Sequence, residues 1–271
     1  MKIKSFDGTE IYYEYEKGRE DKPVLVFLHG VAGNLTLWKK ELEFFKKKKY
    51  STLAVDLRGH GNSSVPKEEK DYFLLCFVKD VRKIIQKEKI NNFVFLGHSF
   101  GGSVAISYLV NYNKILPSKV ILVESTYRYP YVEGKELNCN PLTGYLFNYL
   151  VSKGWFNSRQ SREVDLTKHS HLNIVLKELY YLPLQTILYT LHEASFYSKK
   201  FHTSIVNTLK NTDIPFMFIT GDHDETIDKK FSLEMHSMVK GSKLRIFKNA
   251  DHLLPIEKSE KLCKEIVSFI K

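Results

Sequence analysis

The clearest candidate for chemistry in this 271-residue chain is Ser99, the centre of the pentapeptide G-H-S-F-G at 97–101. An apolar run at 93–96 precedes it, and a small-residue helical stretch at 102–106 follows it. A strand, a sharp turn and a helix in this order form a nucleophile elbow. The glycines fit this turn, because bulkier side chains would collide with the neighbouring strand and helix. The motif therefore predicts an exposed serine nucleophile above a helix N-terminus, which favours developing negative charge.

A serine hydroxyl needs a base to take its proton, and the partners for this lie downstream in the order Ser, acid, His. The apolar run at 214–220 reads as a buried strand and leads into G-D-H-D at 221–224. A second run, 243–247, leads into N-A-D-H at 249–252, which supplies His252. We expect His252 to take the proton of Ser99 and to return it to the leaving group, while a carboxylate orients the imidazole.

In these features the chain resembles the α/β-hydrolase superfamily from end to end. The run at 24–28 continues into H-G-V-A-G at 29–33, which is similar to the family's His-Gly loop. The run at 51–55 leads into D-L-R-G-H-G-N-S at 56–63, which resembles the family's D-x-R-G-x-G-x-S turn and is expected to be structural. The resemblance implies an oxyanion hole made by the backbone amides of Val31 and Phe100, with Ala32 as the alternative first donor.

The triad acid has several candidates. Family members usually place it three residues after the glycine that ends the strand, which selects Asp224 after Gly221. The alternatives, in falling order, are Asp222, Glu124 and Asp228. The predicted catalytic residues are thus Ser99, Asp224 and His252. The other histidines beside the motifs, at 29, 60, 98 and 223, are interpreted as packing or hydrogen-bonding residues, and with no convincing metal-ligand spacing we predict no metal and no cofactor.

Hydrophobic periodicity supplies the elements that position these residues. Strands are predicted near 2–6, 10–16, 24–28, 51–55, 92–97, 119–124, 214–220 and 243–248. Helices are predicted near 34–48, 71–89, 100–112, 228–239 and 256–270. A tight turn at 7–9 joins the first two strands, and strands alternate with helices after that. The pattern predicts an α/β fold, with a mostly parallel, eight-stranded twisted sheet and helices on both faces.

The alternation breaks after Glu124, where about ninety residues pass before the next predicted strand, too many for a plain loop. This segment is rich in aromatic residues, and its part from 172 to 198 has an amphipathic helical pattern that Pro183 should kink or split. The superfamily similarly inserts a helical cap at this point. We predict a core domain of residues 1–124 and 209–271, and a helical cap of residues 125–208 with some aromatic side chains lining the substrate pocket.

Composition narrows the function classes. A content of 43% hydrophobic and 27% charged residues is ordinary for a soluble globular protein. The net charge is +10, but the lysines are dispersed, and the dense run at 46–49 lies where a predicted helix ends and complements its dipole. No nucleic-acid partner is therefore expected. The uncharged stretch at 91–112 is divided by the elbow into a strand and a helix, so we predict no transmembrane segment.

The number of cysteines and the residues at the start of the sequence indicate the cellular compartment. Three scattered cysteines, at 76, 139 and 263, argue against a disulfide framework and for a reducing compartment. The chain starts without an apolar signal-peptide core, so we expect a cytoplasmic protein. The sequence gives no indication of the oligomeric state.

The serine at the elbow distinguishes this chain from the haloalkane dehalogenases and epoxide hydrolases of the superfamily, which use an aspartate there. We expect a carboxylesterase-like serine hydrolase acting on small to medium, largely apolar esters through an acyl-enzyme. The same residues also suit a carbon-carbon, lactone or thioester hydrolase. A non-hydrolytic lyase or a ligand receptor is the alternative from another functional class.

Overall fold

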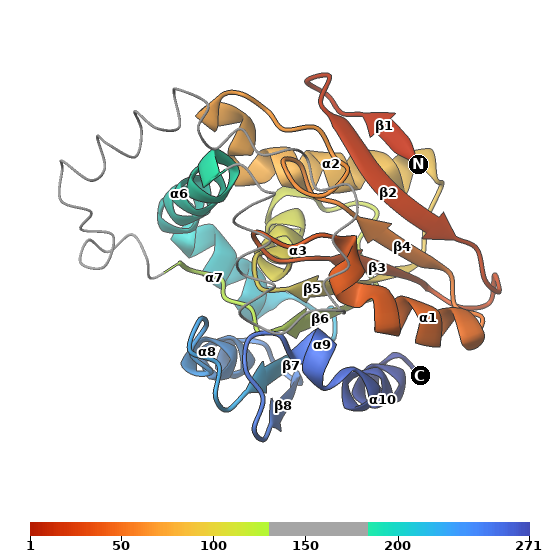
Figure 1. The fold of residues 1–271 in the computed structure, drawn as a ribbon. Helices are drawn as coiled ribbons and strands as arrows, with labels where there is room; N and C mark the ends of the chain where they lie inside the picture. The colour runs from red at the N-terminus through yellow and green to blue at the C-terminus, as the bar shows by residue number, and fades with distance from the viewer. Residues whose placement is uncertain (130–183) are drawn as a thin grey trace.

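The computed structural model describes residues 1–129 and 184–271, and an eight-stranded sheet runs through the middle of this part (Figure 1). The strands are β1 (Lys2–Lys4), β2 (Glu10–Glu16), β3 (Val24–Leu28), β4 (Thr52–Val55), β5 (Phe93–His98), β6 (Lys119–Val123), β7 (Phe216–Gly221) and β8 (Lys243–Phe247). Their order is β1-β2-β4-β3-β5-β6-β7-β8. The β1–β2 and β2–β4 pairs are antiparallel and all other pairs are parallel. The predicted mostly parallel sheet is confirmed.

Helices cover both faces of the sheet, as predicted. The 3₁₀ helices are η1 (Leu35–Trp38) and η2 (Glu69–Tyr72). The α-helices are α1 (Lys39–Lys47), α2 (Leu74–Lys87), α3 (Phe100–Asn111), α6 (Leu184–Lys200), α7 (His202–Asn211), α8 (Lys230–Met238), α9 (Leu254–Glu257) and α10 (Ser259–Ile270). Figure 1 shows α1 and α10 on one side of the sheet and α2 and α3 on the other.

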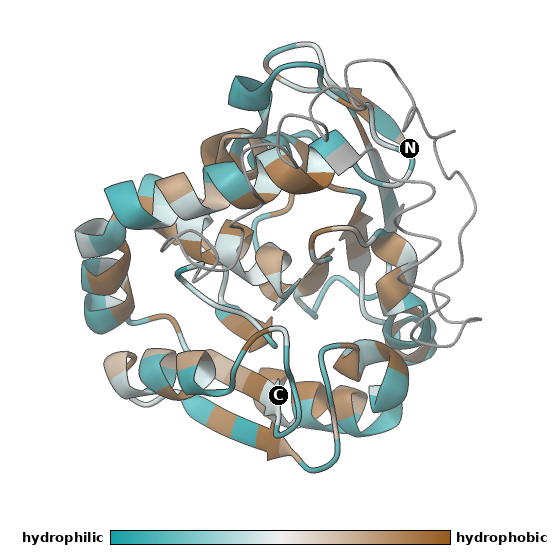
Figure 2. Ribbon diagram, turned by 60° about the vertical axis from the view of Figure 1, so that its left-hand side comes forward, coloured by the Kyte–Doolittle hydropathy of each residue, from teal (hydrophilic) through white to brown (hydrophobic). Residues whose placement is uncertain are grey.

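The central strands are buried on both faces, which explains why they read as unbroken apolar runs. Within β3, Leu25 and Phe27 pack in the core layer that contains η1, α1 and α10. The alternate residues Val26 and Leu28 pack in the layer that contains α2, α3 and α8. Figure 2 shows the result as largely apolar strands surrounded by helices that carry polar and apolar bands.

The helices differ from the predicted ranges where tertiary contacts intervene. The helix expected at 34–48 is divided into η1 and α1, and η1 begins where the Asn34 side chain accepts a hydrogen bond from the Thr36 amide (2.9 Å). The helix expected at 71–89 begins at Leu74, because Phe73 has an extended ψ of 133°. The terminal helix is divided into α9 and α10. Helix α7 was not predicted from periodicity.

The predicted cap, residues 125–208, lies mostly outside the described residues, together with most of its aromatic side chains and the start of the helix expected at 172–198. Its described C-terminal part forms α6 and most of α7, and the expected domain boundary at 208 falls inside α7. Helix α6 packs against η2 and α2, and α7 packs against α3 and α8. None of the described helices is long and apolar enough to cross a membrane.

The turn at 56–63 is held by buried charges. The Arg58 side chain is fully buried, and its Nε and Nη2 donate to the two carboxylate oxygens of Asp80 on α2 (2.7 Å each). Its Nη1 donates to Asp7 (2.8 Å) and to the backbone carbonyl of Asp71 (2.7 Å). One guanidinium thus joins the β1–β2 turn, η2 and α2, and its bidentate geometry is one that lysine could not reproduce.

A second buried ionisable group is the carboxyl of Glu41 on α1. Glu41 on α1 is fully buried, and burial raises the pKa of its carboxyl from 4.5 to about 7, with the Ser259 hydroxyl of α10 opposing this only in part. Because the unfolded chain releases the proton near pH 4.5 and the folded chain retains it until about pH 7, stability falls as the pH rises through this window.

We expect Glu41→Gln to stabilise the protein at pH 8, by up to about 3 kcal/mol, because the amide resembles the protonated carboxyl and removes the ionisation penalty. At pH 4.5 the variant and the wild type should have similar stability. Urea unfolding at both pH values measures the difference. Glu43→Gln, at an exposed position of the same helix, is the matched control and should show no pH-dependent gain. An equal effect of Glu41→Gln at both pH values would contradict the assignment.

Candidate active site

Ser99 lies in a strained turn between β5 and α3. Its backbone has a φ of 49° and a ψ of −118°, a conformation that L-residues rarely adopt. Three hydrogen bonds hold it: the Ser99 amide donates to the Val123 carbonyl (3.0 Å), and the Ser99 carbonyl accepts from the Gly102 amide (3.0 Å) and the Ser125 hydroxyl (2.7 Å). The neighbouring strand β6 and the residues after it therefore fix the serine in place.

The glycines around Ser99 are required by close approach of other backbone. A Cβ on Gly101 would collide with the carbonyl oxygens of Leu28 and His29 at the end of β3. A Cβ on Gly30 would lie 3.0 Å from the Cβ of Ser99. The loop that follows β3 thus passes directly against the elbow.

The two predicted oxyanion donors, Val31 and Phe100, directly follow Gly30 and Ser99 in the sequence. Phe100 contributes the first amide of α3, and the amides of a first helical turn have no partner inside the helix. Val31 directly follows Gly30, and the alternative donor, Ala32, has a left-handed φ of 65°. A loop amide and a helix N-terminus beside one side chain are suited to holding an anionic oxygen.

His252 and Asp224 are hydrogen bonded to each other. The distance from His252 Nδ1 to Asp224 Oδ2 is 2.9 Å. The Asp224 side chain is completely buried, and its Oδ1 accepts from the amides of Thr226 and Ile227 (2.8 Å each). These amides fix the carboxylate so that its other oxygen meets the imidazole. His252 keeps 16% of its side chain exposed, so a molecule entering from solvent can reach the ring.

Two of the alternative acids have other partners. Asp222 bonds to the His223 side chain (2.6 Å) and to the Asn249 amide (2.7 Å), and its hydrogen bond with His223 lowers its pKa. Asp228 accepts from the Lys230 amide (2.8 Å) at the start of α8. Neither is hydrogen bonded to His252 in the described part of the chain.

The third alternative, Glu124, lies in the layer behind His252. It is fully buried, and burial, followed by the nearby Asp224 charge, raises its pKa well above the usual range. Its Oε2 accepts from the Leu254 amide (3.2 Å) and lies 3.6 Å from His98 Nε2. Burial thus disfavours the charged form of Glu124, and its hydrogen bond from the Leu254 amide supports the segment that bears His252.

His98 also supports His252, which sequence reasoning did not foresee. His98 Nε2 donates to the backbone carbonyl of His252 (2.7 Å), and the two rings lie 4.9 Å apart. Burial, followed by the proximity of His252, lowers the pKa of His98 to about 3, so this imidazole is neutral. The contact spans 154 residues of sequence, and no local pattern could have indicated it.

Two further neutral histidines hold the loop beside the elbow. The Leu57 amide donates to His29 Nε2 (2.9 Å), so Nδ1 carries the hydrogen and donates to the Gly30 carbonyl (2.7 Å). Burial lowers the pKa of His29 well below its usual value. His60 donates from Nδ1 to the Arg58 carbonyl (2.8 Å), and burial lowers its pKa to about 4.

In the described residues, two side-chain groups bring potential metal ligands within 4.8 Å of one another. One consists of His98, Glu124 and His252. In this group, His98 bonds to the His252 carbonyl, Glu124 accepts from the Leu254 amide, and His252 bonds to Asp224. The other consists of Glu69 on η2 and of His192 and Glu193 on α6.

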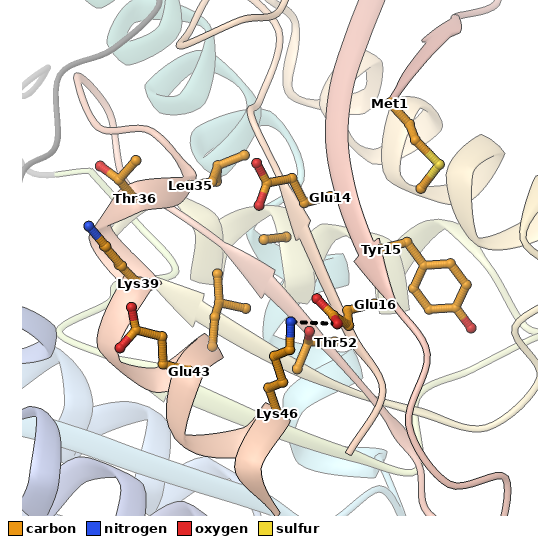
Figure 3. A pocket seen from close by; sticks show the side chains of 12 residues that line it. Met1, Glu14, Tyr15, Glu16, Leu35, Thr36, Lys39, Glu43, Lys46 and Thr52 are labelled. Atoms are coloured by element: carbon orange, nitrogen blue, oxygen red, sulfur yellow. Dashed lines mark ion pairs between the residues drawn. The ribbon is translucent and has the colours of Figure 1, made fainter. Parts of the chain in front are cut away.

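A surface groove of about 640 Å³ lies elsewhere, between β2 and α1 (Figure 3). Leu35, Leu42 and Ala54 form part of its apolar lining. Glu16 and Lys46 face each other across it as an ion pair of 2.6 Å. None of the predicted catalytic residues lines this groove, so it does not belong to the site around Ser99.

Comparison with known proteins identifies the family to which this fold belongs. A model of the alpha/beta hydrolase fold family matches residues 23–259, which is most of the chain. The chain therefore belongs to the alpha/beta hydrolase fold family.

Individual relatives share this fold. Protein ABHD8 of Bos taurus is 37% identical over 107 residues, which are 40% of this chain and 24% of that protein, so the match spans about a quarter of its length. Bifunctional esterase/perhydrolase DCH of Acinetobacter calcoaceticus is 24% identical over 276 residues, 98% of this chain and 97% of that protein. The solved structure of an esterase (EaEST) from Exiguobacterium antarcticum has a TM-score of 0.70 at 22% identity, with 100% of this chain and 98% of that chain covered.

Proposed function

We propose that this protein is a serine hydrolase that cleaves carboxylic esters through Ser99, His252 and Asp224. The observation that carries the proposal is the 2.9 Å hydrogen bond between His252 and a fully buried Asp224, on the same sheet edge as an elbow serine. Of the four candidate acids, Asp224 is the one that bonds to this imidazole in the described structure. A hydrogen-bonded carboxylate fixes the imidazole tautomer and stabilises the imidazolium that forms during attack.

The proposed reaction has two steps. His252 Nε2 takes the Ser99 proton while Oγ attacks the ester carbonyl, and the amides of Val31 and Phe100 stabilise the resulting oxyanion. The imidazolium then protonates the leaving alcohol, which leaves an acyl-enzyme. A water molecule attacks this ester by the same route, so that the acid is released and Ser99 recovers its proton.

The proposed substrates are small to medium, largely apolar esters, taken up under a cap formed by residues 125–208. The support is the aromatic-rich sequence of that segment and the likeness to proteins described as esterases. Lactones, thioesters and carbon-carbon bonds are substrates for the same residues, and a lyase or a ligand receptor is the alternative class. We also propose a cytoplasmic location, because Cys76 and Cys263 are free thiols.

Replacing Ser99 by alanine should abolish labelling by a fluorophosphonate probe and lower ester turnover by at least about 10³-fold, because triad members act as a unit. Ser107→Ala, which removes a buried hydroxyl from α3, the helix that follows Ser99, is the control and should label normally. Probe labelling with p-nitrophenyl acetate turnover provides both measurements. Retention of more than about a tenth of the activity by Ser99→Ala would refute the serine mechanism. Labelling without turnover of any ester would favour a receptor.

Replacing Asp224 by asparagine should lower kcat by about 10³- to 10⁴-fold, since the amide holds the imidazole in the wrong tautomer. Asp222→Asn and Glu124→Gln are matched substitutions at the competing acids and should have far smaller effects. Steady-state kinetics of the three variants, with circular dichroism to verify folding, decides between them. A large loss confined to Glu124→Gln would move the triad acid to the end of β6.

If the proposed cap closes the substrate pocket, it should limit the length of the acyl chain that the enzyme accepts. Each methylene buried in an apolar pocket contributes about 0.8 kcal/mol, which is about fourfold in kcat/KM, until the pocket is full. Specificity constants for p-nitrophenyl esters should therefore rise from acetate to a short or medium chain and then fall. A preference for emulsified long-chain triglycerides would contradict the capped esterase and indicate a lipase.

A further inference from the structure

A cluster of metal-ligand side chains lies where α6 crosses the 3₁₀ helix η2, and it plays no part in the proposed hydrolysis. Glu69 belongs to η2, and His192 and Glu193 belong to α6. One potential ligand atom from each of the three lies within 4.8 Å of the others. The closest pair is His192 Nδ1 and Glu69 Oε1, at 2.5 Å. More than a hundred residues of sequence separate the two halves of this cluster.

The two elements are held in register by contacts that involve none of the three residues. The Tyr72 hydroxyl at the end of η2 is hydrogen bonded to the Thr186 hydroxyl of α6 (3.0 Å). The Tyr72 ring packs against the Tyr189 ring with centroids 5.7 Å apart. The Gln185 amide group donates to the Lys67 carbonyl (2.8 Å). The packing therefore brings the three side chains together before any ion binds.

The donor set is an imidazole and two carboxylates. Two carboxylates at this distance repel each other, and a dication would convert that repulsion into attraction. A nitrogen ligand selects zinc or a similar transition metal over magnesium and calcium, which prefer oxygen ligands alone. Two zinc–ligand bonds of about 2.1 Å span at most about 4.2 Å, so the three ligand atoms, which lie within 4.8 Å of one another, must shift to surround an ion, with the His192 and Glu69 atoms moving apart from 2.5 Å.

We propose that Glu69, His192 and Glu193 form a binding site for a transition-metal dication such as Zn²⁺, with water completing the coordination. The His192 side chain is 60% exposed and that of Glu69 43%, so an ion has direct access from solvent. The metal takes the place of the hydrogen bond between His192 and Glu69 and joins α6 to η2. Metal at this site would fasten α6, in the C-terminal part of the predicted cap, to the core.

Calorimetric titration of EDTA-treated, dialysed protein with ZnCl₂ tests the proposal. We expect one saturable zinc site in the wild type, and a rise in Tm with zinc but not with MgCl₂, because only the folded chain brings the ligands together. His192→Ala should weaken binding by at least about tenfold, the scale on which even outer-shell partners change metal affinity. His223→Ala, which removes a histidine paired with the single carboxylate of Asp222 at 2.6 Å, is the matched control and should bind zinc normally.

Glu193→Gln separates a metal site from a simple ion pair. Without zinc it should leave Tm unchanged or raise it, because it removes the repulsion with Glu69, yet it should weaken zinc binding. The proposal is overturned if wild-type protein shows no saturable zinc binding, or if His192→Ala binds zinc as tightly as wild type. Loss of binding in His252→Ala but not in His192→Ala would instead assign the ion to the group around Glu124. None of these outcomes depends on ester hydrolysis, so failure here leaves the proposed function intact.

Discussion

The arrangement around Ser99 depends on one constraint, the close approach of three backbone segments at the β5–α3 turn. Gly97 and Gly101 are small enough for β5, α3 and the end of β3 to meet without side chains between them. The positive φ of Ser99 is unfavourable by itself. Two hydrogen bonds hold the residue in this conformation, one from the Ser125 hydroxyl to the Ser99 carbonyl and one from the Ser99 amide to the Val123 carbonyl. The turn is therefore held from both neighbouring strands, and its position relative to the loop after β3 follows from packing rather than from the motif alone.

Buried polar side chains hold the segments around this turn in place through hydrogen bonds. Burial is also the main cause of the shifts in the pKa of these side chains. His29, His60 and His98 each place one ring nitrogen on a backbone carbonyl, and desolvation lowers the pKa of all three. Glu124 shows the opposite shift for the same reason, since burial disfavours the charged form of either group. Burial thus disfavours charge on the side chains next to His252 and Asp224. These side chains support the segment that bears the imidazole through hydrogen bonds.

Local sequence patterns were sufficient to predict the elements whose structure depends mainly on their own residues. Strands buried on both faces appear as apolar runs, so β3, β5, β6 and β7 could be predicted to within a few residues. The separate 3₁₀ helix η1 could not, and the Leu35 amide at its first residue is held by Asp56, a contact formed only in the folded chain. Asp224 was selected by its distance from Gly221, but its amide partners and the His98–His252 contact depend on tertiary geometry. The cluster of Glu69, His192 and Glu193 likewise could not be predicted, because it forms only when η2 and α6, which are far apart in the sequence, pack together.

The topology also explains why an insertion after β6 bears on the residues around Ser99. In a parallel sheet, ligands bind beyond the carboxyl ends of the strands, and β5, β6 and β7 end at this edge. The chain leaves β6 in contact with the elbow, because the Ser125 hydroxyl binds the Ser99 carbonyl and the Thr126 carbonyl accepts from Ser103 on α3. It returns through α6, which packs on η2, and α7, which packs on α3. Ser125 and Thr126 thus contact the elbow and α3, and α7 contacts α3, so both described ends of the segment between β6 and β7 pack against elements that position Ser99.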